Sequence, residues 1–294
     1  MDKVIDVAIV GAGPYGLSVA AHLRKLRVEF RIFGGSGRTW PARMPRGLQL
    51  DSDGRASNLS DPEMRFTLKQ YCREHGLSYA DRGEPIELKT FSRYLRAFQQ
   101  RLVPELERKT VVSVTRVAAS FRLRLDDGQM LTARQVVIAT GTGAFRESPA
   151  RPSPRLRLPA SQPQPEPGGG VASHFVTDKP LLFHRLPGAW RSRLLRPCLE
   201  LKASPPSPDA PRVPVSLALL DPEIVMHVRC ADQAPVLSSN FESSMTGLYF
   251  VGALAANSFG PAMRLVSGTG FAAPRLSKRL DQCAWLSLLA GTAD

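Results

Sequence analysis

A glycine-rich turn near the start of the chain restricts the possible folds more than any other feature of the sequence. The apolar, β-branched run at residues 4–10 ends at Gly11-Ala12-Gly13-Pro14-Tyr15-Gly16, and residues 17–26 then place apolar side chains at helical spacing. A second short strand is predicted over residues 28–33. Strand, helix and strand within about thirty residues have the size of one βαβ unit.

The glycines of this turn are the ones that a dinucleotide pyrophosphate requires. Gly11 permits the tight turn, Gly13 lets the backbone approach the phosphates, and Gly16 lets the helix pack on the strand. Free amides and the dipole at the helix start then hold two phosphate charges. An ordinary glycine-rich loop is the alternative, but the flanking strand and helix favour a dinucleotide site. The acid that usually binds the ribose would fall at Gly34, and the next acid is Asp51.

Downstream of this unit the apolar period changes. Helices are predicted to open at Asp61 and, with Thr90 as N-cap, to bury Phe91, Tyr94, Leu95 and Phe98 on one face. An antiparallel β-meander follows, because residues alternate with period two. An NAD dehydrogenase would instead continue with alternating parallel strands and helices. The predicted meander strands are residues 111–117, 121–125 and 129–131, followed by a buried strand at 135–139, a strand at 247–252 and a helix from Pro261.

Composition narrows the class of protein. Residues 144–180 contain eight prolines and residues 203–215 five more, so both stretches are predicted to be flexible. The net charge of +13 is scattered along the chain, which favours a solvated basic surface over a nucleic-acid platform. No apolar run is long enough to span a membrane and the start is unlike a signal peptide, so a cytoplasmic protein is expected. The histidines show no metal-ligand spacing, and the cysteines are expected to be free thiols: Cys72, Cys198, Cys230 and Cys283.

Four short segments in order give a specific resemblance. They are the GAGPYG turn, Gly35-Ser36-Gly37-Arg38-Thr39-Trp40, the ATG at 139–141 and the GLYFVG at 247–252. In these segments the chain resembles the superfamily of flavin-containing monooxygenases and related N-hydroxylating flavoproteins. The resemblance covers residues 1–143 and about 215–280. It implies an α/β fold, a Rossmann-like FAD-binding domain with a βαβ start, a β-meander and a C-terminal strand and helix that complete the site.

The resemblance also implies which residues hold FAD. Trp40 and Met44 would lie along the flavin, with core or surface packing as the alternative, and Asn257 would approach the flavin or simply cap its loop. The aspartate that commonly follows the glycine at 252 is replaced by Ala253. No catalytic acid or base is implied. The implied cofactor-binding residues are Gly11, Gly13, Pro14, Tyr15, Gly16, Trp40, Met44, Val111, Thr140, Gly141, Gly252 and Asn257.

One part of the family pattern is missing. Relatives carry a second G-x-G-x-x-G domain for NADPH after the ATG segment, whereas the glycines here between Gly143 and Gly247 are only Gly168, Gly169, Gly170 and Gly188. NADPH is therefore expected only as an external or weakly bound donor, or a partner reductase or external flavin supplies electrons. The predicted domains are residues 1–143 and 216–280 as the two parts of the FAD-binding domain, 144–215 in place of the nicotinamide domain, and 281–294 as a tail.

Two functions remain open from the sequence. The first is an FAD-dependent oxidoreductase of the flavin monooxygenase type that oxygenates a small molecule. The second is a catalytically silent flavin-binding relic or interaction module. A nucleic-acid-binding or anion-binding protein rests on charge alone.

Overall fold

The computed structural model describes residues 4–34, 49–82, 85–141, 180–186, 191, 219–231 and 234–291. Trp40, Met44 and most of the stretch 144–215 lie outside these residues, as does Cys198. None of the helices in the described ranges combines the length and apolar character that a bilayer crossing needs.

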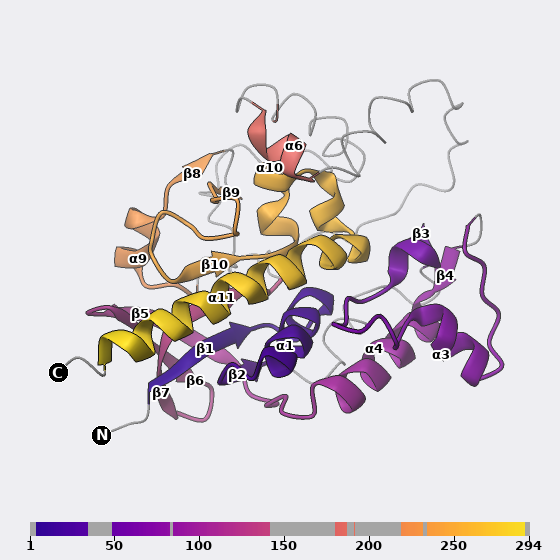
Figure 1. Cartoon of the computed structure of the whole chain (residues 1–294), viewed down its shortest axis with the longest axis horizontal. Coiled ribbons are helices and arrows are strands. Elements are labelled where there is room, and N and C mark those ends of the chain that lie inside the picture. Colours follow the sequence, from indigo (N-terminus) through magenta and orange to yellow (C-terminus); the bar gives the residue numbers. More distant parts are fainter. Residues whose placement is uncertain are drawn as a thin grey trace, which may run out of the picture.

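A six-stranded sheet forms the centre of the molecule (Figure 1). Four of its strands are parallel and lie side by side in the order β2, β1, β7, β10. An antiparallel meander of β5, β6 and β7 continues the sheet. The strands are β1 (Val4–Val10), β2 (Phe30–Phe33), β5 (Val111–Val117), β6 (Ser120–Leu125), β7 (Met130–Ile138) and β10 (Leu248–Phe250).

Strand β7 joins the parallel and antiparallel parts of the sheet. Along one edge its first half pairs with β6, ending at Phe121 opposite Ala133. Along the same edge its last three residues pair with β10, from Leu248 opposite Val136 to Phe250 opposite Ile138. The pattern predicts two strands here, at 129–131 and 135–139, and this is wrong. The structure has a single strand, whose burial changes from alternating beside β6 to continuous beside β10.

Two helices pack against each other beside the sheet, α1 (Pro14–Leu26) and α11 (Thr269–Gly291) (Figure 1). The hydroxyl of Ser277 in α11 donates to the carbonyl of Val19 in α1. Helix α11 continues through residues 281–291, where a tail is predicted. It also begins later than the predicted Pro261, because residues 261–268 form two 3₁₀ turns, η3 (Pro261–Arg264) and η4 (Val266–Gly268).

The helices after β2 begin at other residues than predicted. Asp61 is buried, and its carboxylate accepts the amides of Glu63, Arg65 and Phe66, so it closes a turn instead of opening a helix. Thr90 lies inside its helix. These elements are β3 (Gln49–Asp53), η1 (Arg55–Ser57), α3 (Leu68–Glu74), β4 (Pro85–Glu87) and α4 (Leu88–Leu102), whose predicted apolar face is confirmed by the burial of Phe91, Tyr94, Leu95 and Phe98.

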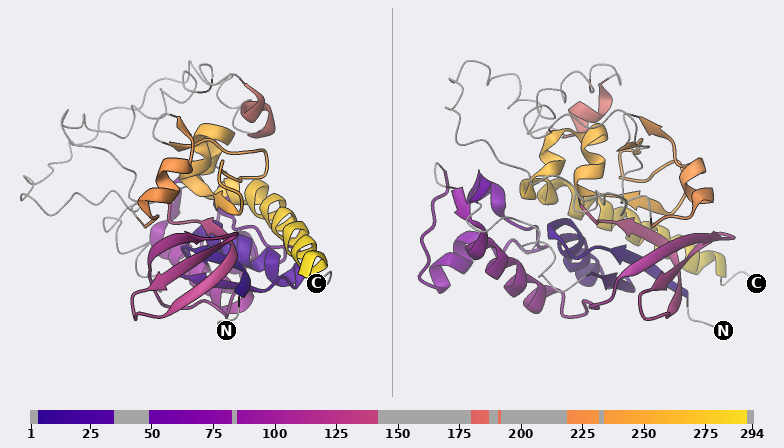
Figure 2. Two further views of the ribbon diagram at one scale, coloured as in Figure 1. Left: turned by 90° about the vertical axis from the view of Figure 1, so that its left-hand side faces the viewer. Right: turned by 180° about the vertical axis from the view of Figure 1, so that it is seen from behind.

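The C-terminal part of the described chain adds β10 to the sheet and packs α11 along α1. Figure 2 shows the meander at one end of the molecule and β3, β4, α3 and α4 at the other. The remaining elements are α6 (Pro180–Arg185), α9 (Pro222–His227), β8 (Cys230–Ala231), β9 (Ala234–Pro235), η2 (Gly252–Ala255) and α10 (Ala256–Phe259). The predicted Rossmann-like α/β architecture is confirmed.

Candidate functional site

The loops that follow the parallel strands meet at one edge of the sheet. The amide of Ala139 donates to the carbonyl of Val10 at 2.8 Å, and that of Val251 donates to Ile138 at 3.1 Å. The turn after β1, the ATG segment after β7 and the GLYFVG glycine after β10 therefore lie together. This is where open α/β sheets bind their ligands.

Gly11 and Gly16 allow this turn to be as tight as it is. Gly11 has a φ of +115°, and a Cβ there would lie 2.4 Å from the carbonyl oxygen of Ala139. A Cβ on Gly16 would lie 1.9 Å from the carbonyl oxygen of Gly11. These two glycines hold the start of α1 against the ends of β1 and β7.

Gly13 is not crowded by the described residues. Among them, a Cβ added there would meet no atom within 4 Å, and its φ of −80° is one that any residue adopts. Gly13 is the N-cap of α1, no side chain caps this helix, and its first turn contains no acid. The amides and the positive end of the helix dipole at this point suit a phosphate group.

Thr140 adds a polar group to the same edge. Its Oγ1 is buried and finds no hydrogen-bond partner among the described residues. A Cβ on Gly11 would lie 3.0 Å from the amide nitrogen of Thr140, so the backbone of Thr140 borders the turn. Gly141, with a φ of +66°, follows it and leaves the space beside it open. An unsatisfied hydroxyl calls for a ligand or a water. The open amides and this hydroxyl thus fit a dinucleotide.

The ribose side of the site departs from the usual pattern for a steric reason. A Cβ on Gly34 would lie 2.6 Å from the Cβ of Ala12 and 2.7 Å from its nitrogen, so no acid fits at this position. The amide of Gly34 donates to the carbonyl of Glu107, but the Glu107 carboxylate binds the guanidinium of Arg31 at 2.5 and 2.7 Å. No sequence pattern predicts this pair, because its members are 76 positions apart.

Tyr15 turns its side chain into the protein. It is buried, and its hydroxyl donates to the carbonyl of Leu265 at 2.9 Å. A Cβ on Gly252 would lie 3.3 Å from the Tyr15 ring, and the φ of Gly252 is +73°. The Tyr15 ring and the positive φ therefore both favour glycine at position 252. Burial raises the pKa of the Tyr15 phenol.

The remaining predicted residues have contacts within the protein. Val111 begins β5 and is buried opposite Leu125. The side-chain amide of Asn257 donates to the carbonyl of Ala231 at 3.1 Å. The carbonyl of Asn257 accepts from Arg191 at 3.5 Å.

Helix α6 packs against α10, the short helix that contains Asn257, and the sequence pattern did not predict this contact. Phe183 is fully buried, and a Cβ on Gly260 would lie 3.2 Å from its ring. The His184 ring stacks on Phe259 with centroids 4.9 Å apart, and its Nδ1 lies 3.3 Å from the carbonyl oxygen of Ser258. Burial lowers the pKa of His184.

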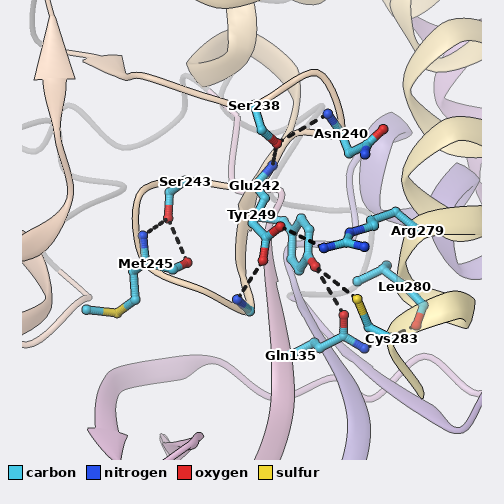
Figure 3. A network of polar contacts seen from close by, with 11 residues as sticks. Gln135, Ser238, Asn240, Glu242, Ser243, Met245, Tyr249, Arg279, Leu280 and Cys283 are labelled. Atoms are coloured by element: carbon cyan, nitrogen blue, oxygen red, sulfur yellow. Dashed lines mark hydrogen bonds and ion pairs between the residues drawn. The ribbon is translucent and has the colours of Figure 1, made fainter. Parts of the chain in front are cut away.

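A second polar cluster surrounds the start of β10 (Figure 3). Glu242 accepts the amide of Gly247 at 3.0 Å and pairs with Arg279 at 3.4 Å. The buried Tyr249 donates its hydroxyl to Gln135 at 3.3 Å. These side chains line a cavity of about 280 Å³. Within the described ranges, no three metal-ligating side chains come together, here or elsewhere.

Comparison with known proteins agrees with this geometry. A sequence model for FAD-NAD(P)-binding domains matches residues 8–143. The fold is similar to a flavin-containing monooxygenase from Stenotrophomonas maltophilia, with a TM-score of 0.56 at 18% identity over 95% of this chain and 98% of that one. It is equally similar to the bacillithiol disulfide reductase Bdr from Staphylococcus aureus, with a TM-score of 0.56 at 13% identity and the same two coverages.

Other matches are partial. An oxidised steroid monooxygenase bound to NADP matches at 22% identity with a TM-score of 0.38, over 48% of this chain and only 26% of that one. This chain therefore spans about a quarter of the length of that relative. No protein of curated function matches the sequence. Residues 8–143 are thus similar to FAD-NAD(P)-binding domains, and the chain shares its fold with a flavin-containing monooxygenase and a bacillithiol disulfide reductase.

Proposed function

We propose that the chain is an FAD-dependent oxidoreductase of the flavin monooxygenase type that oxygenates a small molecule. The observation that carries the proposal is the meeting, at one sheet edge, of the uncapped α1 N-terminus at Gly13 with the buried, unpartnered hydroxyl of Thr140. This combination suits the pyrophosphate and a neighbouring polar group of a dinucleotide.

Each part of the edge has a role in this proposal. The backbone at Gly13 and the start of α1 hold the pyrophosphate, with Pro14 setting the first helical turn. Thr140 supplies a hydrogen bond to the cofactor, and Gly141 lets it pass close to the backbone. When bound, FAD supplies two-electron redox chemistry and reaction with oxygen. The protein orients the cofactor and excludes water from it. The ribose is held without an acid at Gly34.

The proposed electron donor is external. The chain has one G-x-G-x-x-G turn, and the few glycines between Gly143 and Gly247 do not form a second. We therefore place residues 144–215 where relatives have a nicotinamide domain. Electrons come from NAD(P)H bound weakly or from a partner reductase.

A spectrum of the purified protein tests the proposal. Bound FAD should absorb at about 450 nm, a property of the cofactor. NADPH under air should bleach this band slowly, and dithionite should bleach it at once. A colourless protein that takes up no added FAD would overturn the flavin assignment. Rapid, repeated bleaching by NADPH would contradict the proposed loss of a nicotinamide site.

A flavin-binding module without turnover is the second candidate. The absence of room for an acid at Gly34 favours it, because relatives use that contact to hold the cofactor. This candidate predicts a yellow protein that dithionite bleaches and NADPH does not, with no product formed from amines or sulfides when reduced nicotinamide and an added reductase are supplied.

A further inference from the structure

We propose that Tyr15 is a positioning residue: its hydroxyl clamps the segment between Gly252 and Gly268 onto the dinucleotide turn, so that both halves of FAD are held in one geometry. The inference rests on the proposed function. Phosphate binding by the GAGPYG turn does not need a tyrosine side chain at its fifth position. The inference gives Tyr15 a separate role, that of holding residues 252–268 against the turn.

The clamp joins residues that are remote in sequence. Tyr15 lies in the first turn of α1, and its hydroxyl donates to the carbonyl of Leu265 at 2.9 Å across 250 positions. The carbonyl of Ala262 lies 3.4 Å from the same hydroxyl. The Tyr15 hydroxyl thus contacts the carbonyls of Ala262 and Leu265, next to the junction between η3 and η4.

The segment leaves room for the Tyr15 ring by having glycine on two sides. A Cβ on Gly252 would lie 3.3 Å from the ring. A Cβ on Gly268 would lie 2.1 Å from the hydroxyl oxygen and 2.5 Å from the carbonyl oxygen of Ala262. Any side chain at Gly268 would therefore displace either the phenol or the backbone that it binds.

Hydrogen bonds, more than its side chain, hold the backbone of Leu265. Its amide donates to the carbonyl of Ala262 at 3.0 Å, and its carbonyl accepts the Tyr15 hydroxyl at 2.9 Å and the amide of Gly268 at 3.3 Å. Leu265 is extended, with φ −100° and ψ 158°, and so separates the two 3₁₀ turns. Its side chain is 40% exposed and contributes little packing. Losing the Tyr15 hydroxyl would leave the Leu265 carbonyl with only the longer bond from the amide of Gly268, at 3.3 Å, and so loosen this joint. Burial keeps the pKa of the phenol above its usual value, so it remains a donor at neutral pH.

Tyr249 offers a matched control. It is fully buried, and its hydroxyl donates to Gln135 at 3.3 Å in the separate cluster at the start of β10 (Figure 3). Tyr249→Phe removes a buried phenol hydroxyl of the same kind without touching the clamp.

Calorimetric titration of the full chain with FAD and with ADP tests the clamp. ADP contains only the half of the cofactor that the turn binds. Tyr15→Phe should raise the Kd for FAD about tenfold, the effect of one lost hydrogen bond, while the Kd for ADP stays within about twofold. Gly268→Ala, which pushes the segment away from Tyr15, should produce the same selective loss. Tyr249→Phe should change neither Kd.

Each other outcome counts against a distinct claim. Equal losses of FAD and ADP affinity in Tyr15→Phe would reduce Tyr15 to a structural residue of the turn and overturn the clamp. An unchanged FAD affinity and unchanged visible circular dichroism of the bound flavin would overturn it as well. A wild-type chain that binds ADP but no FAD would instead overturn the proposed function, and the clamp as a flavin device with it.

Discussion

Gly13 and Gly16 belong to one turn, yet an added methyl group meets different surroundings at the two positions. At Gly13 it meets no atom of the described chain within 4 Å, whereas at Gly16 it lies 1.9 Å from the carbonyl oxygen of Gly11. One glycine is therefore needed by the fold. The other is needed only by whatever approaches the turn.

This contrast gives a paired prediction. Gly13→Ala should change the free energy of unfolding by less than about 0.5 kcal/mol but raise the Kd for FAD at least about tenfold, because the methyl group fills the approach to the phosphates. Gly16→Ala should cost on the order of 3 kcal/mol of stability. Urea unfolding and FAD titration measure both. Loss of stability without loss of affinity in Gly13→Ala would contradict a phosphate site there.

Thr140→Val separates a ligand contact from a structural one. The hydroxyl has no partner among the described residues, so its replacement by a methyl group should leave the melting temperature of the cofactor-free protein unchanged or slightly higher. The same change should weaken FAD binding about tenfold. Thr115→Val, at an exposed hydroxyl of β5, is the control. A lowered melting temperature of the cofactor-free variant would show that the hydroxyl serves the fold.

The motif alone predicts the roles of the turn glycines, because their spacing reflects the geometry of one local turn. It does not predict the contacts that distant residues make with them. The approach of Ala12 to Gly34 and the ion pair of Glu107 with Arg31 depend on how the segment before β5 meets β2. The sequence identifies the missing acid, and the structure supplies the reason.

At the scale of elements, the docking of α6 on α10 depends on a histidine with a lowered pKa. Burial is the main cause, and the nearby Arg191 and Arg275 lower the pKa of His184 further, against the opposing hydrogen bond to Ser258. The folded protein then binds this proton less readily than the unfolded chain. The stabilising contribution of His184 is present above its unfolded pKa of about 6.5 and is lost as the pH falls below it.

Urea unfolding at two pH values measures this contribution. Between about pH 7.5 and 5.5 the midpoint should fall less in His184→Gln than in the wild type. His227→Gln, at an exposed position on α9, should behave as the wild type. His22, whose pKa burial also lowers, is present in all three proteins, so the difference belongs to His184. An equal fall in all three would contradict the docking argument.

Elements were predicted correctly where the spacing of apolar residues is the same along the whole element. They were predicted wrongly where the surroundings of an element change along its length. The apolar face of α4 was predictable because its spacing repeats over the whole helix. Strand β7 was split in prediction because its pattern alternates beside β6 and becomes continuously apolar beside β10. Asp61 resembles a helix cap, since it accepts backbone amides, but it does so in a turn.

At the scale of the whole molecule, the two sequence-distant parts form one folding unit. The last residues of β7 pair with β10, and α11 packs along α1. A chain ending at residue 143 should therefore show no cooperative urea transition, because it exposes the apolar edge and face that the C-terminal part covers. Circular dichroism during urea titration checks this. A sharp transition with FAD binding in that fragment would show that the N-terminal part is self-sufficient.

The edge of β7 that pairs with β10 stays uncovered during part of protein synthesis. Residues 136–138 leave the ribosome long before their partners at 248–250. At bacterial or eukaryotic elongation rates the intervening stretch takes on the order of ten seconds to make. During that interval β7 presents unpaired amides and carbonyls that another chain can join. This stretch of the β7 edge is covered only after Phe250 has been made and has left the ribosome.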